Sequence, residues 1–114
     1  MILYGLKNCD TCKKALKGLA AAGHDPQFVD IRLDADLPVK LPGWLTTVGR
    51  EALTNTRSTT WRGLDEAERA QAGSDKGAIA LLSTNPTLIK RPVIEHGRKV
   101  SVGWTKNVQT ALGV

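Results

Sequence analysis

The chain has two cysteines, Cys9 and Cys12, in the stretch KNCDTCKK at residues 7–14. Thiolate is the reactive form of cysteine, and a Cys-X-X-Cys thiol at a helix start commonly ionises below the free value of about 8.5. The lysines of this stretch add positive potential near Cys9, whereas the carboxylate of Asp10 works against them. We therefore expect Cys9 to be a nucleophile for thiol–disulfide chemistry, with a modestly lowered pKa.

Cys12 lies one helical turn further on, where its thiol can attack a mixed disulfide or a sulfenic acid on Cys9 and release the product. The alternative role is packing, because Cys12 also continues an apolar stripe and a buried thiol behaves as a small apolar group. A zinc ion would need two more ligands. Only His24 and His96 are available, and they lack the short spacing of common zinc sites. We expect no metal and no bound cofactor.

The second informative stretch is IKRPVI at residues 89–94. A proline just before a strand is a candidate for a cis peptide bond, which occurs in only about 5–6% of X–Pro bonds. If the fold brings this loop beside Cys9, Arg91 supplies a forked donor for a carboxylate or an oxyanion. Arg57 is a further candidate, and for both arginines an exposed charge is the alternative. We expect Trp61 to pack.

The elements that would position Cys9 form a strand–helix–strand unit. Ile2–Tyr4 is a short apolar run that ends at Gly5, which predicts a buried strand. Apolar residues then recur every three or four positions from Asp10, which predicts an amphipathic helix that closes near Gly23. A second strand at 27–31 completes a βαβ unit with parallel strands.

The rest of the chain is predicted to be a helical segment followed by a hairpin and a last helix. Helices are indicated at 41–48, 50–53, 65–72 and after Ser74, strands at 93–94 and 99–102, and a closing helix at 104–112 with Thr105 as its cap. The predicted class is α/β with mixed α+β character: a small mixed sheet of about four strands and an all-helical insert.

The composition is that of one globular domain of 114 residues, with 41% hydrophobic and 24% charged residues. No run approaches the roughly 20 apolar residues of a membrane span, and the start does not resemble a signal peptide. The formal charge is +5, but only 4% of the residues are aromatic, so a stacking surface for nucleic acid is not expected. We expect a cytoplasmic monomer that binds neither membrane nor nucleic acid.

Four stretches together resemble the arsenate-reductase-like (ArsC/Spx) family: LYGLKNCDTCKKA, LTNTRSTTWRGLDE, LIKRPVI and VGW-T. The chain is most similar to the YffB-type branch, whose members are regarded as glutathione-dependent thiol reductases. The resemblance runs from Met1 to about Leu112 in the same order and with similar spacing. It implies a single thioredoxin-like domain at 1–114, with its core at 1–33 and 86–114 and a helical insert at about 34–85.

The resemblance also implies that Cys9 is the nucleophile and that Arg91 precedes a cis-Pro92. It implies a cytosolic thiol-disulfide reductase with glutathione as co-substrate and glutaredoxin as a further partner, acting on an oxidised thiol or an oxyanion. The expected catalytic residues are Cys9 and Cys12. The residues expected to contact glutathione or substrate are Lys7, Asn8, Arg57, Arg91 and Pro92.

Two other functions stay open. Arsenate reductases of this kind bind the oxyanion with three arginines, of which only Arg91 has a clear counterpart, and Asn55 stands where a second would be. They also carry a histidine where this chain has Gly5. Members of the branch often have an aliphatic residue at the position of Cys12, which suggests glutathione as the resolving thiol. The CDTC pair is also similar to the switch of Spx-type regulators that bind RNA polymerase.

Overall fold

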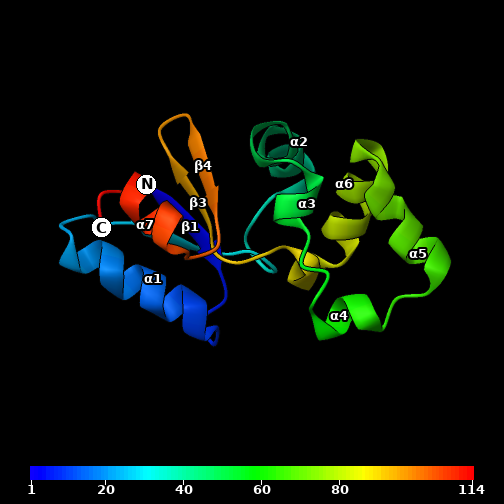
Figure 1. Ribbon diagram of the computed structural model, residues 1–114, viewed down its shortest axis with the longest axis horizontal. Coiled ribbons are helices and arrows are strands. Elements are labelled where there is room, and N and C mark those ends of the chain that lie inside the picture. Colours follow the sequence, from blue (N-terminus) through cyan, green and yellow to red (C-terminus); the bar gives the residue numbers. More distant parts are fainter. The chain divides into compact units, whose positions relative to one another are not determined.

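The computed structural model describes residues 1–114, and the chain forms two compact units. Residues 1–35 and 91–114 form the first, which we call the sheet unit, and residues 36–90 form the second, which we call the helical unit (Figure 1). None of the helices is both long enough and apolar enough to cross a membrane.

The sheet unit contains four strands and two helices. These are β1 (Ile2–Gly5), α1 (Asp10–Ala21), β2 (Gln27–Asp30), β3 (Val93–His96), β4 (Lys99–Val102) and α7 (Lys106–Ala111). The strand order is β2-β1-β3-β4, with β1 and β2 parallel and the other pairs antiparallel. The predicted α/β class and four-stranded mixed sheet are therefore confirmed, as are the βαβ unit and the hairpin.

The core of the sheet unit lies between the sheet and the helices α1 and α7 (Figure 1). It is built from Leu3, Ala15, Leu19, Ile94 and Leu112, all of which are at most 4% exposed. Each of the large aliphatic side chains stabilises the unit by about 1.5–3 kcal/mol relative to an exposed one. This packing holds α1 against β1 and so fixes the start of the helix, where Cys9 lies.

Close approach of α1 and the segment before α7 depends on Gly18. A Cβ atom at this position would lie 2.9 Å from Cζ2 of Trp104, which is closer than real Cβ contacts. The Trp104 ring therefore covers the bare backbone of α1 at Gly18. Thr105 caps α7 as predicted, because its hydroxyl accepts a hydrogen bond from the backbone N–H of Val108 at 3.3 Å.

The helical unit consists of short helices without a sheet. They are α2 (Leu37–Val48), α3 (Arg50–Leu53), α4 (Thr59–Arg62), α5 (Glu66–Ala70) and α6 (Asp75–Thr84), with 3₁₀ turns at Gln71–Gly73 and Pro86–Leu88. The helix predicted at 41–48 begins four residues earlier, because Pro38 fits the first turn of a helix and does not end it. The α4 helix was not predicted. Its signal was Ser58, whose hydroxyl accepts from the backbone N–H of Trp61 at 3.1 Å.

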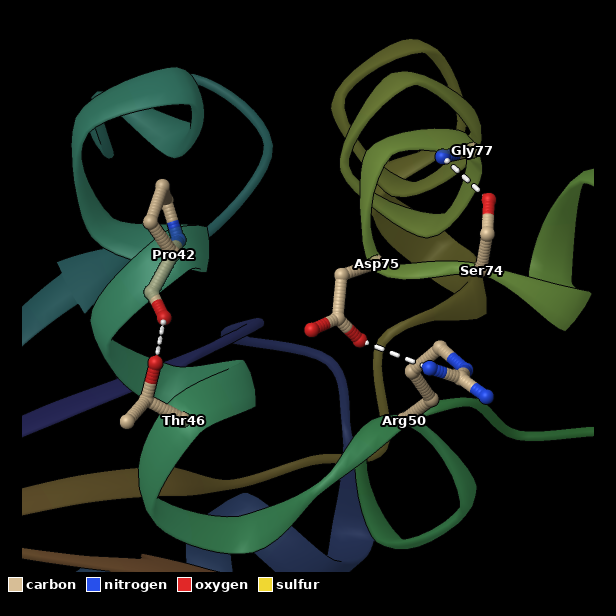
Figure 2. A network of polar contacts seen from close by, with 6 residues as sticks. All are labelled: Pro42, Thr46, Arg50, Ser74, Asp75 and Gly77. Atoms are coloured by element: carbon tan, nitrogen blue, oxygen red, sulfur yellow. Dashed lines mark hydrogen bonds and ion pairs between the residues drawn. The ribbon is translucent and has the colours of Figure 1, made fainter.

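Local polar contacts hold the helix starts and ends of this unit together (Figure 2). The Ser74 hydroxyl accepts a hydrogen bond from the backbone N–H of Gly77 at 3.0 Å, which confirms the predicted cap of α6. The next residue, Asp75, accepts from the Arg50 guanidinium of α3 at 2.8 Å and forms a salt bridge with it. Both side chains are exposed, so this pair contributes at most about 1 kcal/mol.

Candidate functional site

Cys9 lies at the junction of β1 and α1. After β1 ends at Gly5 the chain turns, and the backbone N–H of Cys9 donates to the carbonyl of Leu6 at 3.2 Å. The carbonyl of Cys9 accepts the first helical hydrogen bond from Lys13 at 3.0 Å, so Cys9 is the N-cap residue of α1. Its side chain is partly exposed. The first backbone N–H groups of α1 have no helical partner and favour negative charge beside them.

The Cys9 thiol ionises more readily than a free thiol. Partial burial opposes ionisation, but the backbone N–H and the thiol of Cys12 and the Arg91 guanidinium favour the thiolate. The positive charge of Arg91 acts in the same direction. Together these groups outweigh burial and lower the pKa of Cys9. The predicted direction is confirmed, but Arg91 and Cys12 cause the shift, and the neighbouring lysines are not among the groups responsible.

Strand pairing brings Arg91 to Cys9 across more than eighty residues of sequence. Tyr4 in β1 lies opposite Val93 in β3, so the residues before β3 reach the end of β1 where the turn to Cys9 begins. The Arg91–Pro92 peptide bond is cis, as the resemblance implied. Pro92 is fully buried, and its carbonyl accepts a hydrogen bond from the backbone N–H of Gly103 at 2.8 Å. The arginine therefore arrives on a segment that is held firmly in the sheet unit.

Cys12 is fully buried on α1, one turn after Cys9. Burial is the largest effect on its thiol and raises the pKa, the neighbouring Cys9 acts in the same direction, and a backbone hydrogen bond from Leu6 and the charge of Arg91 act against them; the net pKa is about 11. At pH 7 only about one in ten thousand Cys12 side chains is then a thiolate. In the resting protein Cys12 is therefore a hydrogen-bond donor to Cys9 and a poor nucleophile.

Sequence reasoning missed the role of Gly5, the last residue of β1. A Cβ atom at this position would lie 2.5 Å from the Sγ of Cys12. The bare backbone of Gly5 therefore provides the space that the buried sulfur occupies. The available signal was the glycine itself, since glycine in a strand often marks a close approach of another group.

We expect Gly5→Ala to lower the free energy of unfolding by about 1–3 kcal/mol, because the added methyl overpacks the contact with Cys12. Urea unfolding measures this loss, and iodoacetamide alkylation of Cys9 should show an altered pH profile in the same variant. The same Gly5→Ala substitution is also measured in a Cys12→Ala background, which lacks the sulfur that the added methyl would meet. An equal cost of Gly5→Ala in both backgrounds would show that the Cys12 sulfur is not the obstacle.

The other predicted contact residues lie in two places. Lys7 and Asn8 are exposed in the turn that precedes Cys9. Arg57 belongs to the helical unit, where it lines a pocket together with Asn55 and Lys90. That any of these residues contacts substrate stays a prediction.

The two histidines, although far apart in sequence, lie side by side, with ring centroids 6.0 Å apart. His24 follows the C-terminal end of α1, and its Nε2 is 2.8 Å from the carbonyl of Leu112. The helix separates this end from Cys9 by roughly 18 Å, given 1.5 Å per residue. The histidines therefore cannot complete a zinc site with the cysteines.

Comparisons with known proteins agree over almost the whole chain. Residues 4–111 match the profile of the ArsC family. An uncharacterized protein from Haemophilus influenzae is 45% identical over 106 residues, which cover 91% of this chain and 90% of that protein. The solved structure of the protein YffB has a TM-score of 0.89 and 35% identity, and covers 99% of this chain and 98% of its own. An arsenate reductase (ArsC) related protein from Brucella melitensis has a TM-score of 0.72 and 38% identity, with coverages of 96% and 91%.

Proposed function

This chain belongs to the ArsC family, and we propose that it is a cytosolic, glutathione-dependent thiol-disulfide reductase with the Cys9 thiolate as its nucleophile. The observation that carries this proposal is the contact of the Arg91 guanidinium and the Cys12 thiol with the Cys9 sulfur, which lowers the pKa of Cys9. A partly exposed thiolate at a helix start is suited to attack a disulfide sulfur.

The proposed reaction starts from a mixed disulfide between glutathione and a substrate thiol. The Cys9 thiolate attacks the glutathione sulfur, which forms a Cys9–glutathione disulfide and expels the substrate thiolate, and this takes a proton from solvent. A second glutathione, as thiolate, attacks the glutathione sulfur of that intermediate. Oxidised glutathione leaves and the Cys9 thiolate is restored. Glutathione supplies the two electrons that reduce the substrate.

Glutathione is the better resolving thiol in this scheme than Cys12. When Cys9 is in a disulfide it no longer carries a negative charge. The contribution of Cys9 to the raised pKa of Cys12 is then lost. Burial is the first cause of the raised pKa of Cys12, and it persists in the intermediate. We propose that Cys12 mainly holds the Cys9 thiolate by hydrogen bonding and that it resolves the intermediate only slowly.

The residues around Cys9 would bind the glutathione part of the substrate. We propose that Arg91 pairs with a carboxylate or with the developing thiolate, and that the backbone at Pro92 lies along the peptide. Lys7 and Asn8 are exposed beside Cys9 and can reach the polar ends of the tripeptide. Arg91 is suited to this role because its planar fork matches a carboxylate in two parallel hydrogen bonds.

The test is capture of the intermediate. The protein is mixed with a glutathionylated peptide without free glutathione, quenched with acid, and analysed by intact-mass and peptide mass spectrometry. We expect one glutathione on Cys9 and one equivalent of released peptide thiol, followed by turnover once glutathione is added. Release of peptide no faster than in buffer would refute the proposal.

Arsenate reduction is the second candidate, favoured by the family match and by the guanidinium at Cys9. It would require the Cys9 thiolate to form a sulfur–arsenic bond with arsenate, with loss of water, and glutathione with glutaredoxin to supply the two electrons that release arsenite. An assay for arsenite with both cofactors present distinguishes the two activities. Arsenite release without peptide reduction would replace the first proposal with the second.

A further inference from the structure

Helix α1 presents a row of exposed lysines beside the reactive thiol. One face of α1 packs on the sheet unit, and the opposite face is open to solvent (Figure 1). With 3.6 residues per turn, three lysines lie within roughly 100° of one another on that open face. They are Lys13, Lys14 and Lys17, and all three are exposed. We call them the lysine stripe.

The lysine stripe begins one helical turn from Cys9. The backbone N–H of Lys13 donates to the carbonyl of Cys9 at 3.0 Å, so the two residues are neighbours across the first turn of α1. Lys17 follows one turn later, which places the end of the stripe roughly 12 Å along the helix axis from Cys9. Because Cα–Cβ bonds tilt toward the N-terminus of a helix, the lysine side chains lean toward Cys9. A molecule that reacts at Cys9 therefore lies within reach of the stripe.

Interactions within the chain do not account for the lysine stripe. Lys13 and Lys14 are spaced four and three residues from Lys17, and like charges at these spacings destabilise a helix. None of the three forms a salt bridge. Positive charge stabilises the C-terminal end of a helix, yet the last turn of α1 has no basic residue. These lysines are also not among the groups that lower the pKa of Cys9. Contact with a molecule outside the chain would explain their placement.

Positive charge is concentrated on the unit that contains Cys9. The sheet unit has nine lysines and arginines against five acidic residues, whereas the helical unit has seven against six. Four of the five net positive charges of the chain therefore lie on the sheet unit. Between residues 7 and 17 there are four lysines and one carboxylate, that of Asp10. A field of this sign raises the rate at which an acidic partner reaches the surface.

An acidic segment of a protein fits the lysine stripe better than a nucleic acid does. The open face of α1 has no aromatic residue on which bases could stack. The carboxylate of Asp10 would repel a continuous phosphate backbone, whereas a peptide can carry acidic side chains only where the lysines lie. In an extended peptide, about four residues span the roughly 12 Å between Cys9 and the end of the stripe.

We propose that the lysine stripe binds an acidic segment of the protein whose glutathionylated cysteine is reduced at Cys9, with Asp or Glu side chains within about four residues of that cysteine. This inference rests on the proposed function and names its class of substrate. The stripe contributes to the encounter with the substrate and to the choice between substrates. It takes no part in the chemistry at sulfur.

Three glutathionylated peptides test the substrate class. They differ only in the residues beside the cysteine, which are glutamates, serines or lysines, and each kcat/KM is taken relative to the rate of the same peptide with glutathione alone. At low ionic strength we expect the glutamate peptide to exceed the serine peptide by about tenfold and the lysine peptide to be the slowest. Added salt should remove most of this difference, because it screens the charges.

Paired substitutions assign the preference to the lysine stripe. Lys13→Gln with Lys17→Gln should lower kcat/KM for the glutamate peptide by about tenfold. Turnover of the serine peptide and alkylation of Cys9 by the neutral reagent iodoacetamide should not change, since neither depends on the stripe. Replacing both lysines by glutamate should make the lysine peptide the best substrate. Circular dichroism checks that α1 is retained in each variant.

The matched control removes two charges elsewhere on the sheet unit, in Arg98→Gln with Lys99→Gln. Both residues are exposed at the turn between β3 and β4. Because β3 runs antiparallel to β1, this turn lies at the end of the sheet away from Cys9. The control should keep the wild-type order of the three peptides. If it loses the preference to the same extent as the stripe variant, net charge alone is responsible and the inference is overturned.

A binding experiment without chemistry separates this inference from the proposed function. Peptides with serine in place of the cysteine are titrated into ¹⁵N-labelled Cys9→Ser protein at low ionic strength and followed by NMR. We expect saturable shifts of the backbone amides of residues 10–21 with the glutamate peptide and none with the lysine peptide. These shifts without turnover of any glutathionylated peptide would refute the reductase and keep the binding of an acidic partner.

The same titration contains the outcomes that overturn the inference. It is overturned if the glutamate peptide gives no saturable shift along α1, or if the lysine peptide binds equally well. A single-stranded oligonucleotide and a vesicle that contains phosphatidylserine are tested at the same salt concentration. If either binds α1 more tightly than the glutamate peptide, the partner is not an acidic protein segment.

Discussion

Replacing Cys9 by serine should lower the turnover of a glutathionylated peptide by roughly a thousandfold or more, because a serine hydroxyl at neutral pH is a far weaker nucleophile than a thiolate. The serine would keep the position and nearly the size of the side chain. The contacts from Cys12 and Arg91 stabilise negative charge on sulfur, and they have no anion to act on in the variant. The measurement is release of peptide thiol with glutathione at a fixed concentration.

Cys12→Ala is the control for this experiment. If glutathione resolves the intermediate, Cys12→Ala keeps most of the turnover, and the loss reflects only the missing hydrogen bond to Cys9, about tenfold at most. Circular dichroism confirms that both variants fold. Equal rates for the wild type and Cys9→Ser would show that Cys9 is not the nucleophile, and a collapse of activity in Cys12→Ala would make Cys12 the resolving thiol.

The sheet unit was largely predictable from sequence because its elements obey local rules. The run Ile2–Tyr4, the apolar spacing after Asp10 and the cap at Thr105 are each short-range signals, and each corresponds to an observed element. Because the crossover between two parallel strands is almost always right-handed, only a few arrangements of the βαβ unit are possible. Local signals thus sufficed for the position of Cys9 at a helix start.

The helical unit was predicted less well because its signals are weaker. The helix α4 has only four residues, and its segment contains Thr59 and Thr60, which are poor helix formers. A single capping residue, Ser58, determines where it begins. The loop before α4 was recognised as a motif in the sequence. The burial of Thr54 at the start of this loop, however, depends on its antiparallel bridge to Ile89, and no local sequence pattern predicts that contact.

The chemistry of the site depends on contacts that sequence spacing does not encode. Lys7, Lys13 and Lys14 lie close to Cys9 in sequence, and sequence reasoning assigned the lowered pKa to these lysines together with the start of the helix. The structure assigns it to a hydrogen bond with Cys12 and to Arg91, which strand pairing brings from the far end of the chain. Water and salt screen the charge of an exposed lysine, so its effect on the pKa of Cys9 is weak. A guanidinium in contact with the sulfur is screened much less and has a larger effect.

Replacing Arg91 by glutamine should raise the pKa of Cys9, because both its hydrogen bond and its positive charge favour the thiolate. Fewer Cys9 side chains are then ionised at pH 7, and the substrate also loses a forked donor. Turnover at pH 7 should therefore fall about 10- to 100-fold.

The pH dependence separates these two effects of Arg91→Gln. Alkylation of Cys9 by iodoacetamide needs only the thiolate, so its pH profile should move to higher pH, and the rates of wild type and variant should converge once both are fully ionised. Turnover of the peptide should stay low at that pH if Arg91 also binds substrate. Arg91→Lys keeps the charge but not the fork, so it should restore alkylation more than turnover. Arg98→Gln, an exposed arginine in the turn between β3 and β4, is the matched control. An unchanged alkylation profile in Arg91→Gln would exclude Arg91 as the group that activates Cys9.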